Sequence, residues 1–456
     1  MIGIKLKHKH DIDIVNGPLL SNIIVFAVPI IITNILQMLY NAADMIVVGR
    51  FSGSIALAAT GASSPLINLI INMFAGFSAG INSIAARYIG ARDDERTSDT
   101  VHTSYALSIV CGFAILIFGI AVCRPILHHM GTPDEVIDYS VTYTRIIFLG
   151  TPALLTYNFG AAVLRSMGDT KRPLYFLTAS GLINVVLNLI FVIVFNMNVA
   201  GVALATVISQ YISAILVTLT LIRCENSCHL NIRNIKFHKN ELSQIIKLGL
   251  PAGIQSCTFA FSNLLIQSSV NSFGSTAMSG FTAGANILNF PNTIMDAFSS
   301  TAIVFVAQNY GAQNYKRITA SAVQCSIIVT VLGILMGLAM NIFGNQLIGI
   351  YAPGEAEVAM YGMMYLSKFK YITCFGGLNG VSTASLRGLG KSFVPMLVSI
   401  AGICGFRILW IYTIFSKIPT LDILYTSYPI SWVVTATVSS IMFYMLASKF
   451  KSKNKQ

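Results

Sequence analysis

Charged residues are scarce in this sequence. Asp, Glu, Lys and Arg make up 10% of its 456 residues, whereas soluble domains carry about 25%. Hydrophobic residues make up 55% of the chain, and the mean hydropathy is +0.71. Apolar runs long enough to cross a bilayer, roughly 20 residues each, recur along the whole length. The composition excludes an ordinary soluble domain and predicts an integral membrane protein with many helical spans.

Motifs for common enzyme chemistry are also missing. No GxxxxGK[ST] pattern for binding nucleotide phosphates occurs. The seven His residues lie in predicted tails, loops or span ends, so no Ser/His/Asp set can be assembled. Cys224, Cys228 and His229 share a polar loop but lack a fourth metal ligand. We therefore expect a protein that is not an enzyme and that has no cofactor and no metal site.

The distribution of basic residues predicts the orientation of the chain. We place twelve spans, at 20–48, 55–84, 101–123, 139–163, 174–195, 200–222, 245–270, 277–306, 318–345, 360–386, 393–415 and 423–447. Of the 29 Lys and Arg residues, 22 fall on the side that also holds both termini. The positive-inside rule makes that side cytoplasmic. It also explains the net charge of +12 without a nucleic-acid partner. We expect a multi-pass, monomeric protein of the cell (inner or plasma) membrane, surrounded by lipid bilayer.

The sequence repeats itself after about 222 residues. LRSMGDTKRP, ending at Pro173, matches LRGLGKSFVP, ending at Pro395, and FAVP at Pro29 matches LGLP at Pro251. Because each half has an even number of spans, the halves are parallel repeats, a design that suits alternating access. The sequence thus predicts an all-α polytopic membrane protein of two homologous six-helix bundles. Its predicted parts are a basic tail at 1–18, a bundle at 19–222, a linker at 223–243, a bundle at 244–447 and a basic tail at 448–456.

A polar seam marks the first predicted span. Asn34, Gln37, Asn41 and Asp44 follow one another at spacings of 3, 4 and 3, which places them on one face of a helix. A carboxylate in mid-bilayer costs roughly 2.5–3.5 kcal/mol, so it should face a bundle interior or a wet cavity. There it could bind a proton or a monovalent cation. The alternative is that the Asn and Gln side chains hold helices together.

Other polar side chains could line the same cavity or a second one. Asn286, Asn289, Thr293 and Asp296 repeat the 3, 4, 3 spacing on the eighth span, so Asp296 is a further candidate. Asn184 and Asn188 share a face of the fifth span. The remaining candidates are Tyr157 and Asn158 on the fourth span and Gln255 on the seventh. Interhelical hydrogen bonding is the simpler reading of each amide.

These features resemble the multidrug and toxic compound extrusion (MATE) family. The resemblance covers residues 18–447 and rests on the two six-span repeats and four stretches of sequence: LYNAADMIVVG, MGTPDEV, LRSMGDTKRP and AQNYGAQNYKR. It implies an exporter of organic cations or amphipathic drugs, driven by inward flow of protons or sodium ions.

Within that family the chain is most similar to the DNA-damage-inducible prokaryotic type. That resemblance implies an acidic residue at Asp44 and amides at Asn158 and Asn184. The pattern has Asp where this chain has Asn188, so a second carboxylate is missing. The norfloxacin-exporter type has acids near Phe259 and Gly376, where this chain has none.

We therefore expect an antiporter in which Asp44, Asn158, Asn184 and Asn188 form the cation-coupling site. Asn34, Gln37, Asn41, Tyr157, Gln255 and Asp296 are expected to line the substrate cavity. A lipid-linked precursor flippase is an alternative, but Arg145 and Arg407 are the only basic residues well inside spans that could receive its phosphates. A sensor or scaffold without transport is the other.

Overall fold

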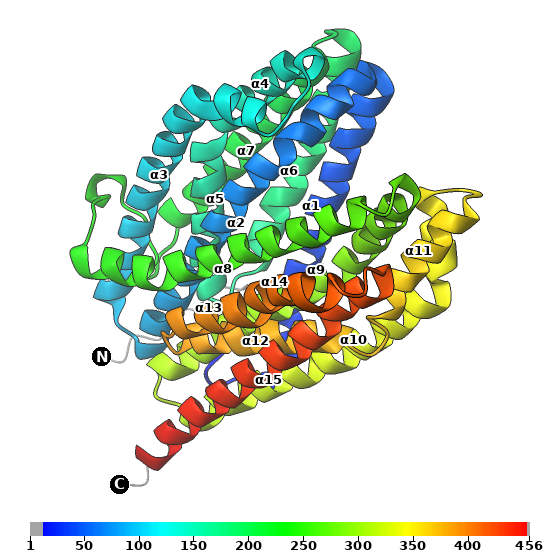
Figure 1. Ribbon diagram of the computed structural model, residues 1–456. Coiled ribbons are helices and arrows are strands. Elements are labelled where there is room, and N and C mark those ends of the chain that lie inside the picture. The colour runs from blue at the N-terminus through cyan, green and yellow to red at the C-terminus, as the bar shows by residue number, and fades with distance from the viewer. Residues whose placement is uncertain (1–11, 454–456) are drawn as a thin grey trace, which may run out of the picture. The chain divides into compact units, whose positions relative to one another are not determined.

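The computed structural model describes residues 12–453, with side chains through Lys449. The described residues are helices joined by short loops, with no strand among them. Most of the tail predicted at 1–18 lies outside the described residues. So do the last three residues of the tail predicted at 448–456 and the side chains from Phe450 onward. Figure 1 shows the helices in chain order from blue to red.

The twelve predicted spans each correspond to one helix or to a chain of short helices. The first six spans are α1 (Leu19–Val47), α2 (Gly53–Ala91), α3 (Asp94–His129), α4 with α5 (Asp134–Leu149, Thr151–Ser166), α6 with η2 (Lys171–Leu189, Ile190–Val194) and α7 (Asn198–Ile222). The next six are α8 (Lys239–Asn271), α9 (Ser275–Gly311), α10 (Tyr315–Tyr351), α11 with α12 (Ala356–Ser367, Thr373–Gly388), α13 to η5 (Phe393–Phe415) and α15 (Leu421–Lys453). The predicted all-α fold class of two six-helix repeats is confirmed.

Hydropathy alone finds fewer of these spans. Among the described residues, seven helical stretches are long and apolar enough to cross a membrane, and α4 with α5, bent by 45°, would be an eighth. The stretch from Leu19 to Ala91 passes as one, although it holds α1, the π-helical turn η1 (Val48–Ser52) and α2. Helices α8 and α9 are excluded from the hydropathy set. The repeat therefore places spans that hydropathy misses.

The repeat is visible in the backbone conformation as well as in the sequence. Residues with positive φ recur 221 to 223 positions apart in the pairs Gly53 and Gly274, Arg92 and Gln313, Gly131 and Gly354, and Gly168 and Gly390. The residues after Arg92 and Gln313 are Asp93 and Asn314, and each side chain caps the next helix by accepting from a backbone N–H. Left-handed backbone is costly for non-glycine residues, so its recurrence at Arg92 and Gln313 indicates a shared loop design.

The chain forms two compact units that do not follow the linear order of the halves. One unit contains 28–249 and the other contains 14–27 and 250–456. Residues 14–27 belong to the second unit because Phe26 packs edge-on against Phe305 and Arg317 donates to the carbonyl oxygens of Ile14 and Gly17. This assignment differs from the predicted bundle boundary at residue 19. Helices α1 and α8 therefore each run from one unit into the other, next to Pro29 and Pro251.

Each unit has its own apolar core. In the first, side chains of α2, α3, α5, α7 and the start of α8 pack around Phe159. In the second, an aromatic cluster joins α9, α11 and α15, where Tyr365 contacts the rings of Phe281, Tyr425 and Tyr428. Figure 1 shows α9, α10, α12 and α15 running side by side within this unit.

A buried carboxylate fixes the loop between α5 and α6. Asp169 is fully buried, accepts from the backbone N–H groups of Lys171 and Arg172 at 3.1 Å each, and pairs with the Arg172 guanidinium at 3.1 Å. We expect Asp169→Ala to lower the free energy of unfolding by about 1–2 kcal/mol, because the first turn of α6 loses its acceptor. Thermal melting of purified protein measures this loss. Asp93, the half-buried cap of α3, serves as the comparison, and an equal effect of Asp93→Ala would contradict the role of complete burial.

Candidate functional site

Asp44 lies where three helices of the first unit meet. It is in the last turn of α1, and it faces Asn184 and Asn188 on α6 and Thr206 on α7. Asn188 donates from Nδ2 to Oδ1 of Asp44, and Thr206 donates from Oγ1 to Oδ2 at 3.4 Å. The carboxylate is half-buried and Asn188 is fully buried. Asp44 is thus held by neutral donors, with no basic residue within ion-pairing distance in the described chain.

Asn184 completes this polar cluster. Its Oδ1 accepts from Asn188 and its Nδ2 donates to Thr206, both at 3.3 Å. With its amide turned over, the nitrogen instead donates to Asp44 at 3.0 Å. Oδ1 of Asn188 is buried without a hydrogen-bond partner. The cluster therefore offers a carboxylate and a spare amide oxygen close together, which are ligands suited to a proton or a small hard cation.

The cluster is closed by apolar side chains and by two unusual turns. Val47, Val192 and Val202 belong to one buried group beside it. The π-helical turn η1 follows Asp44 by four residues, and η2 follows Asn188 by two. π-helical turns are rare and occur frequently at functional sites. Here they terminate the α-helical hydrogen bonding of the two helices that carry the principal side chains.

The structure brings neither Asn158, the remaining predicted member of the coupling site, nor Tyr157, a predicted cavity residue, into this cluster. Asn158 donates to Leu154 O of its own helix at 2.9 Å. Tyr157 is buried and donates from its hydroxyl to Pro173 O at 3.2 Å, which ties α5 to the start of α6. In the described chain neither side chain bonds Asp44, so the coupling role of Asn158 and the cavity-lining role of Tyr157 stay predictions.

The rest of the predicted seam follows α1 away from the cluster. Asn34 is half-buried, whereas Gln37 and Asn41 are exposed. None of the three shares a hydrogen bond with Asp44 in the described chain. An exposed amide on a membrane helix needs water or lipid head groups as partners, which is consistent with a wet cavity. Their predicted part in lining that cavity stays a prediction.

The second unit holds its candidates differently. Asp296 on α9 is exposed, and in the described chain it has no hydrogen bond or ion pair. Gln255 is buried, donates to Ser399 Oγ at 2.6 Å and accepts from the Arg387 guanidinium. Gln255 thus belongs to an internal network that joins α8, α12 and α13. Of the two predicted acids, only Asp44 accepts hydrogen bonds from other side chains in the described chain.

An arginine occupies the corresponding region of the second unit. At an offset of 222 residues, Tyr428 corresponds to Thr206, and Arg407 follows the position that corresponds to Asn184. Arg407 is 2% exposed, and its guanidinium lies 3.9 Å from the centroid of the Tyr428 ring. It donates to Ser262, Asn263 and Ser431 at 3.2 to 3.3 Å. The second repeat therefore places a buried positive charge next to the position that corresponds to Asn184.

Sequence reasoning did not identify Thr206, and it considered Arg407 a functional residue only for phosphate binding in the alternative flippase. A lone Thr in a membrane helix usually bonds its own backbone, and Thr206 also does so with Val202 O at 3.0 Å. Nothing in the spacing of α7 therefore distinguishes it. For Arg407 the signal was present, since a charge in mid-span is a functional candidate by default.

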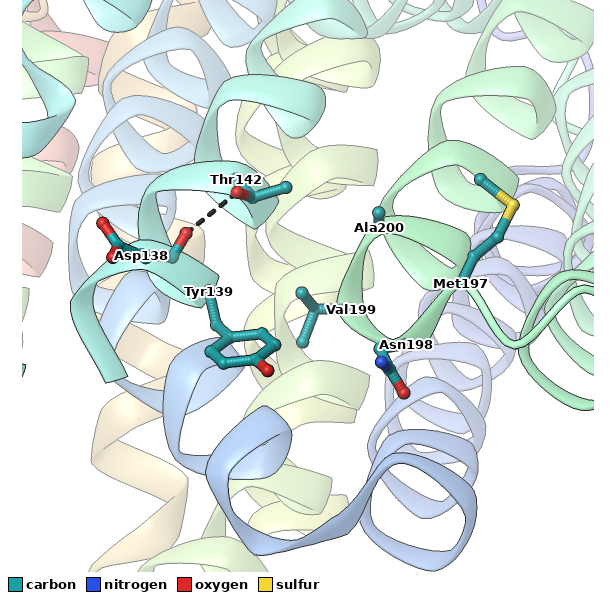
Figure 2. A pocket seen from close by; sticks show the side chains of 7 residues that line it. All are labelled: Asp138, Tyr139, Thr142, Met197, Asn198, Val199 and Ala200. Atoms are coloured by element: carbon teal, nitrogen blue, oxygen red, sulfur yellow. Dashed lines mark hydrogen bonds between the residues drawn. The ribbon is translucent and has the colours of Figure 1, made fainter. Parts of the chain in front are cut away.

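A separate pocket lies near the starts of α4 and α7. Figure 2 shows its lining, which is Asp138, Tyr139, Thr142 and residues 197–200. Asp138 pairs with Arg124 at 3.0 Å, and both side chains are more than half exposed. The pocket contains none of the predicted site residues, so it does not compete with the Asp44 cluster as a coupling site.

Known proteins resemble this chain over most of its length. The "Probable multidrug resistance protein YoeA" of Bacillus subtilis is 25% identical over 90% of both chains. The "Probable multidrug resistance protein YpnP" of the same organism is 28% identical over 85% of this chain and 86% of its own. Among solved structures, a MATE protein crystallised in the bent conformation has a TM-score of 0.90 at 22% identity. It covers 97% of this chain, which in turn covers 98% of it. A MOP superfamily transporter from Pyrococcus furiosus has the same TM-score and identity, and the match covers 96% of this chain and 98% of that transporter.

The profile of one family matches both repeats. The MatE profile matches residues 29–190 and again 251–413, which together are more than half of the chain. The two matches begin at Pro29 and Pro251, the positions where the repeat was first visible. This multi-pass membrane protein therefore belongs to the MatE family, the multidrug and toxic compound extrusion transporters.

Proposed function

We propose that this protein is a secondary antiporter that exports organic cations and amphipathic drugs in exchange for protons or sodium ions. The observation that carries the proposal is the cluster of Asp44, Asn184, Asn188 and Thr206. It is a carboxylate inside a membrane helix, held by neutral donors and without a basic partner among the residues that the structure describes. Such a group can change its charge by taking up an ion, whereas a carboxylate in an ion pair is already neutralised.

Coupling requires the ion and the drug to bind the two states of the transporter with different affinities. With an ion on Asp44, the negative charge that attracts a cationic drug is neutralised, and the drug leaves to the outside. Loss of the ion to the cytoplasm restores the charge and the affinity for drug. The spare Oδ1 of Asn188 supports a bound sodium ion, and the hydrogen bonds to Asp44 accommodate a proton equally well.

The division of the chain into two compact units supports alternating access as the transport mechanism. Helices α1 and α8 pass from one unit to the other at residues 27–28 and 249–250, just before Pro29 and Pro251. Proline interrupts helix hydrogen bonding and favours a kink. We propose that these repeat-related points bend when the units exchange access between the two sides. Both termini and the 223–243 linker would face the cytoplasm, and the coupling ion would be the only cofactor.

Purified protein in liposomes tests this function. Ethidium fluorescence would be followed while a pH gradient and a sodium gradient are imposed separately. We expect ethidium to move against one of these ion gradients and to stay still in protein-free liposomes. Movement that follows neither gradient would contradict the antiporter and favour a sensor or scaffold.

Arg407 provides the one observation in favour of a lipid-linked precursor flippase, because such a transporter needs cationic groups for phosphates. However, Ser262, Asn263, Ser431 and the Tyr428 ring already surround its guanidinium. Binding of a pyrophosphate-linked lipid, measured beside ethidium on the same preparation, separates the two functions. Lipid binding without ethidium binding would support the flippase.

A further inference from the structure

A His and two carboxylates meet at the start of α8. Asp99 lies on α3, whereas His238 precedes the first turn of α8 and Glu241 lies within it. One ligand atom from each of the three lies within 4.8 Å of the others. His238 Nδ1 is 3.0 Å from Asp99 Oδ2. Asp99 is far from the other two in the sequence, which is why the sequence predicted no metal site.

Glu241 gives the second, independent indication of a ligand. The residue is 5% exposed, yet in the described chain it makes no hydrogen bond or ion pair. Arg96 interacts with Glu241 electrostatically, but its side chain is 57% exposed and forms its ion pair with Asp93. Burial of an ionised carboxylate without a partner is costly unless it is paired or coordinates a metal. A bound cation would remove this penalty.

Hydrogen bonds around the cluster fix the linker backbone against α3. The backbone N–H of His238 donates to Thr103 Oγ1, and that of Asn231 donates to His102 Nε2, both at 3.1 Å. These bonds attach the linker to α3 about one helical turn beyond Asp99, independently of Asp99 and Glu241. The capping position of His238 is thus fixed by Thr103, and the Glu241 carboxylate is left for another partner.

We propose that Asp99, His238 and Glu241 form a binding site for a divalent transition metal ion that clamps the start of α8 to α3. One imidazole nitrogen with carboxylate oxygens suits zinc and its neighbours rather than magnesium or calcium, which prefer oxygen ligands. Ligands of a tetrahedral zinc ion lie roughly 3.4 Å apart, so small side-chain rotations would complete the site. Water would supply the fourth ligand. The clamp lies within the first unit and does not rest on the proposed transport function.

Zinc binding to the purified, chelator-treated full chain tests the site. Calorimetry is expected to show that one zinc ion binds per chain and that magnesium binds more weakly. Zinc should also raise the thermal midpoint of unfolding. Glu241→Gln and His238→Ala should each weaken zinc binding by more than about tenfold. Without metal, Glu241→Gln should melt at or above the wild-type temperature, because it removes a buried charge. This reversal separates a metal ligand from a purely structural glutamate.

Two control variants test whether zinc binds at the proposed site or at another Cys or His residue nearby. Cys228→Ser alters the Cys and His group in the same linker, and His129→Ala removes an exposed His from the other end of α3. Both should bind zinc as wild type does, and a cobalt-loaded sample should lack the intense absorption of thiolate ligands. Full affinity in Glu241→Gln and His238→Ala would overturn the proposal. Loss of affinity in Cys228→Ser alone, or no zinc binding above background, would also overturn it.

Discussion

Asp44→Asn is expected to reduce gradient-driven ethidium export to the level of protein-free liposomes. The substitution keeps the size of the side chain and an oxygen that can accept from Asn188, so the packing of α1, α6 and α7 should survive. It removes the charge that an ion must neutralise, so the drug and the ion no longer compete. Export under the pH gradient and under the sodium gradient would be measured on the same preparations.

Two further substitutions make this result specific. Asp138→Asn removes an exposed carboxylate of the same unit and should transport at nearly the wild-type rate. Thr206→Val loses the hydroxyl bonds to Asp44, Asn184 and Val202 O but keeps the Asp44 charge, so it should slow transport less than Asp44→Asn. Wild-type export by Asp44→Asn would place coupling elsewhere, and Asp296 would then be the next carboxylate to change.

Gly333→Val is expected to destabilise the second unit by about 3 kcal/mol. A Cβ at Gly333 would lie 2.5 Å from Cys374 Cα and 2.7 Å from its backbone nitrogen. Because the obstacle is backbone, α10 and α12 would have to move apart. Gly112 makes the related approach in the first unit, where a Cβ would lie 2.5 Å from Pro152 Cα. The thermal midpoint of purified protein in detergent measures the loss.

The same helix offers a matched control. Gly349 lies on α10 near its end, and a Cβ there would meet nothing within 4 Å. Gly349→Ala should leave the midpoint unchanged or raise it slightly, since Ala favours helix over Gly by about 0.8–1.0 kcal/mol. If Gly333→Val melted at the wild-type temperature, the close contact between α10 and α12 could not be limiting for stability.

Much of this protein followed from its sequence alone. The scarcity of charge predicted a membrane protein, and the motifs around Pro29 and Pro251 predicted two homologous bundles, which the helices and the recurring left-handed residues confirm. The sequence also singled out Asp44, because a carboxylate in an apolar helix is costly wherever that helix packs. These properties depend on composition and local spacing, so they can be predicted without knowing which helices meet.

Tertiary structure decided which side chains act together. Helical periodicity states which face of one helix is polar, but it does not state which other helix that face meets. For this reason the sequence did not predict that Thr206 bonds Asp44. Asn158 and Tyr157, in contrast, donate to the backbone oxygens of Leu154 and Pro173. The same reason applies to segment 14–27, which packs in the second unit, and to Asp99, which meets His238 across more than a hundred residues of chain. Each of these contacts depends on the packing of helices that are far apart in sequence, and no local pattern encodes it.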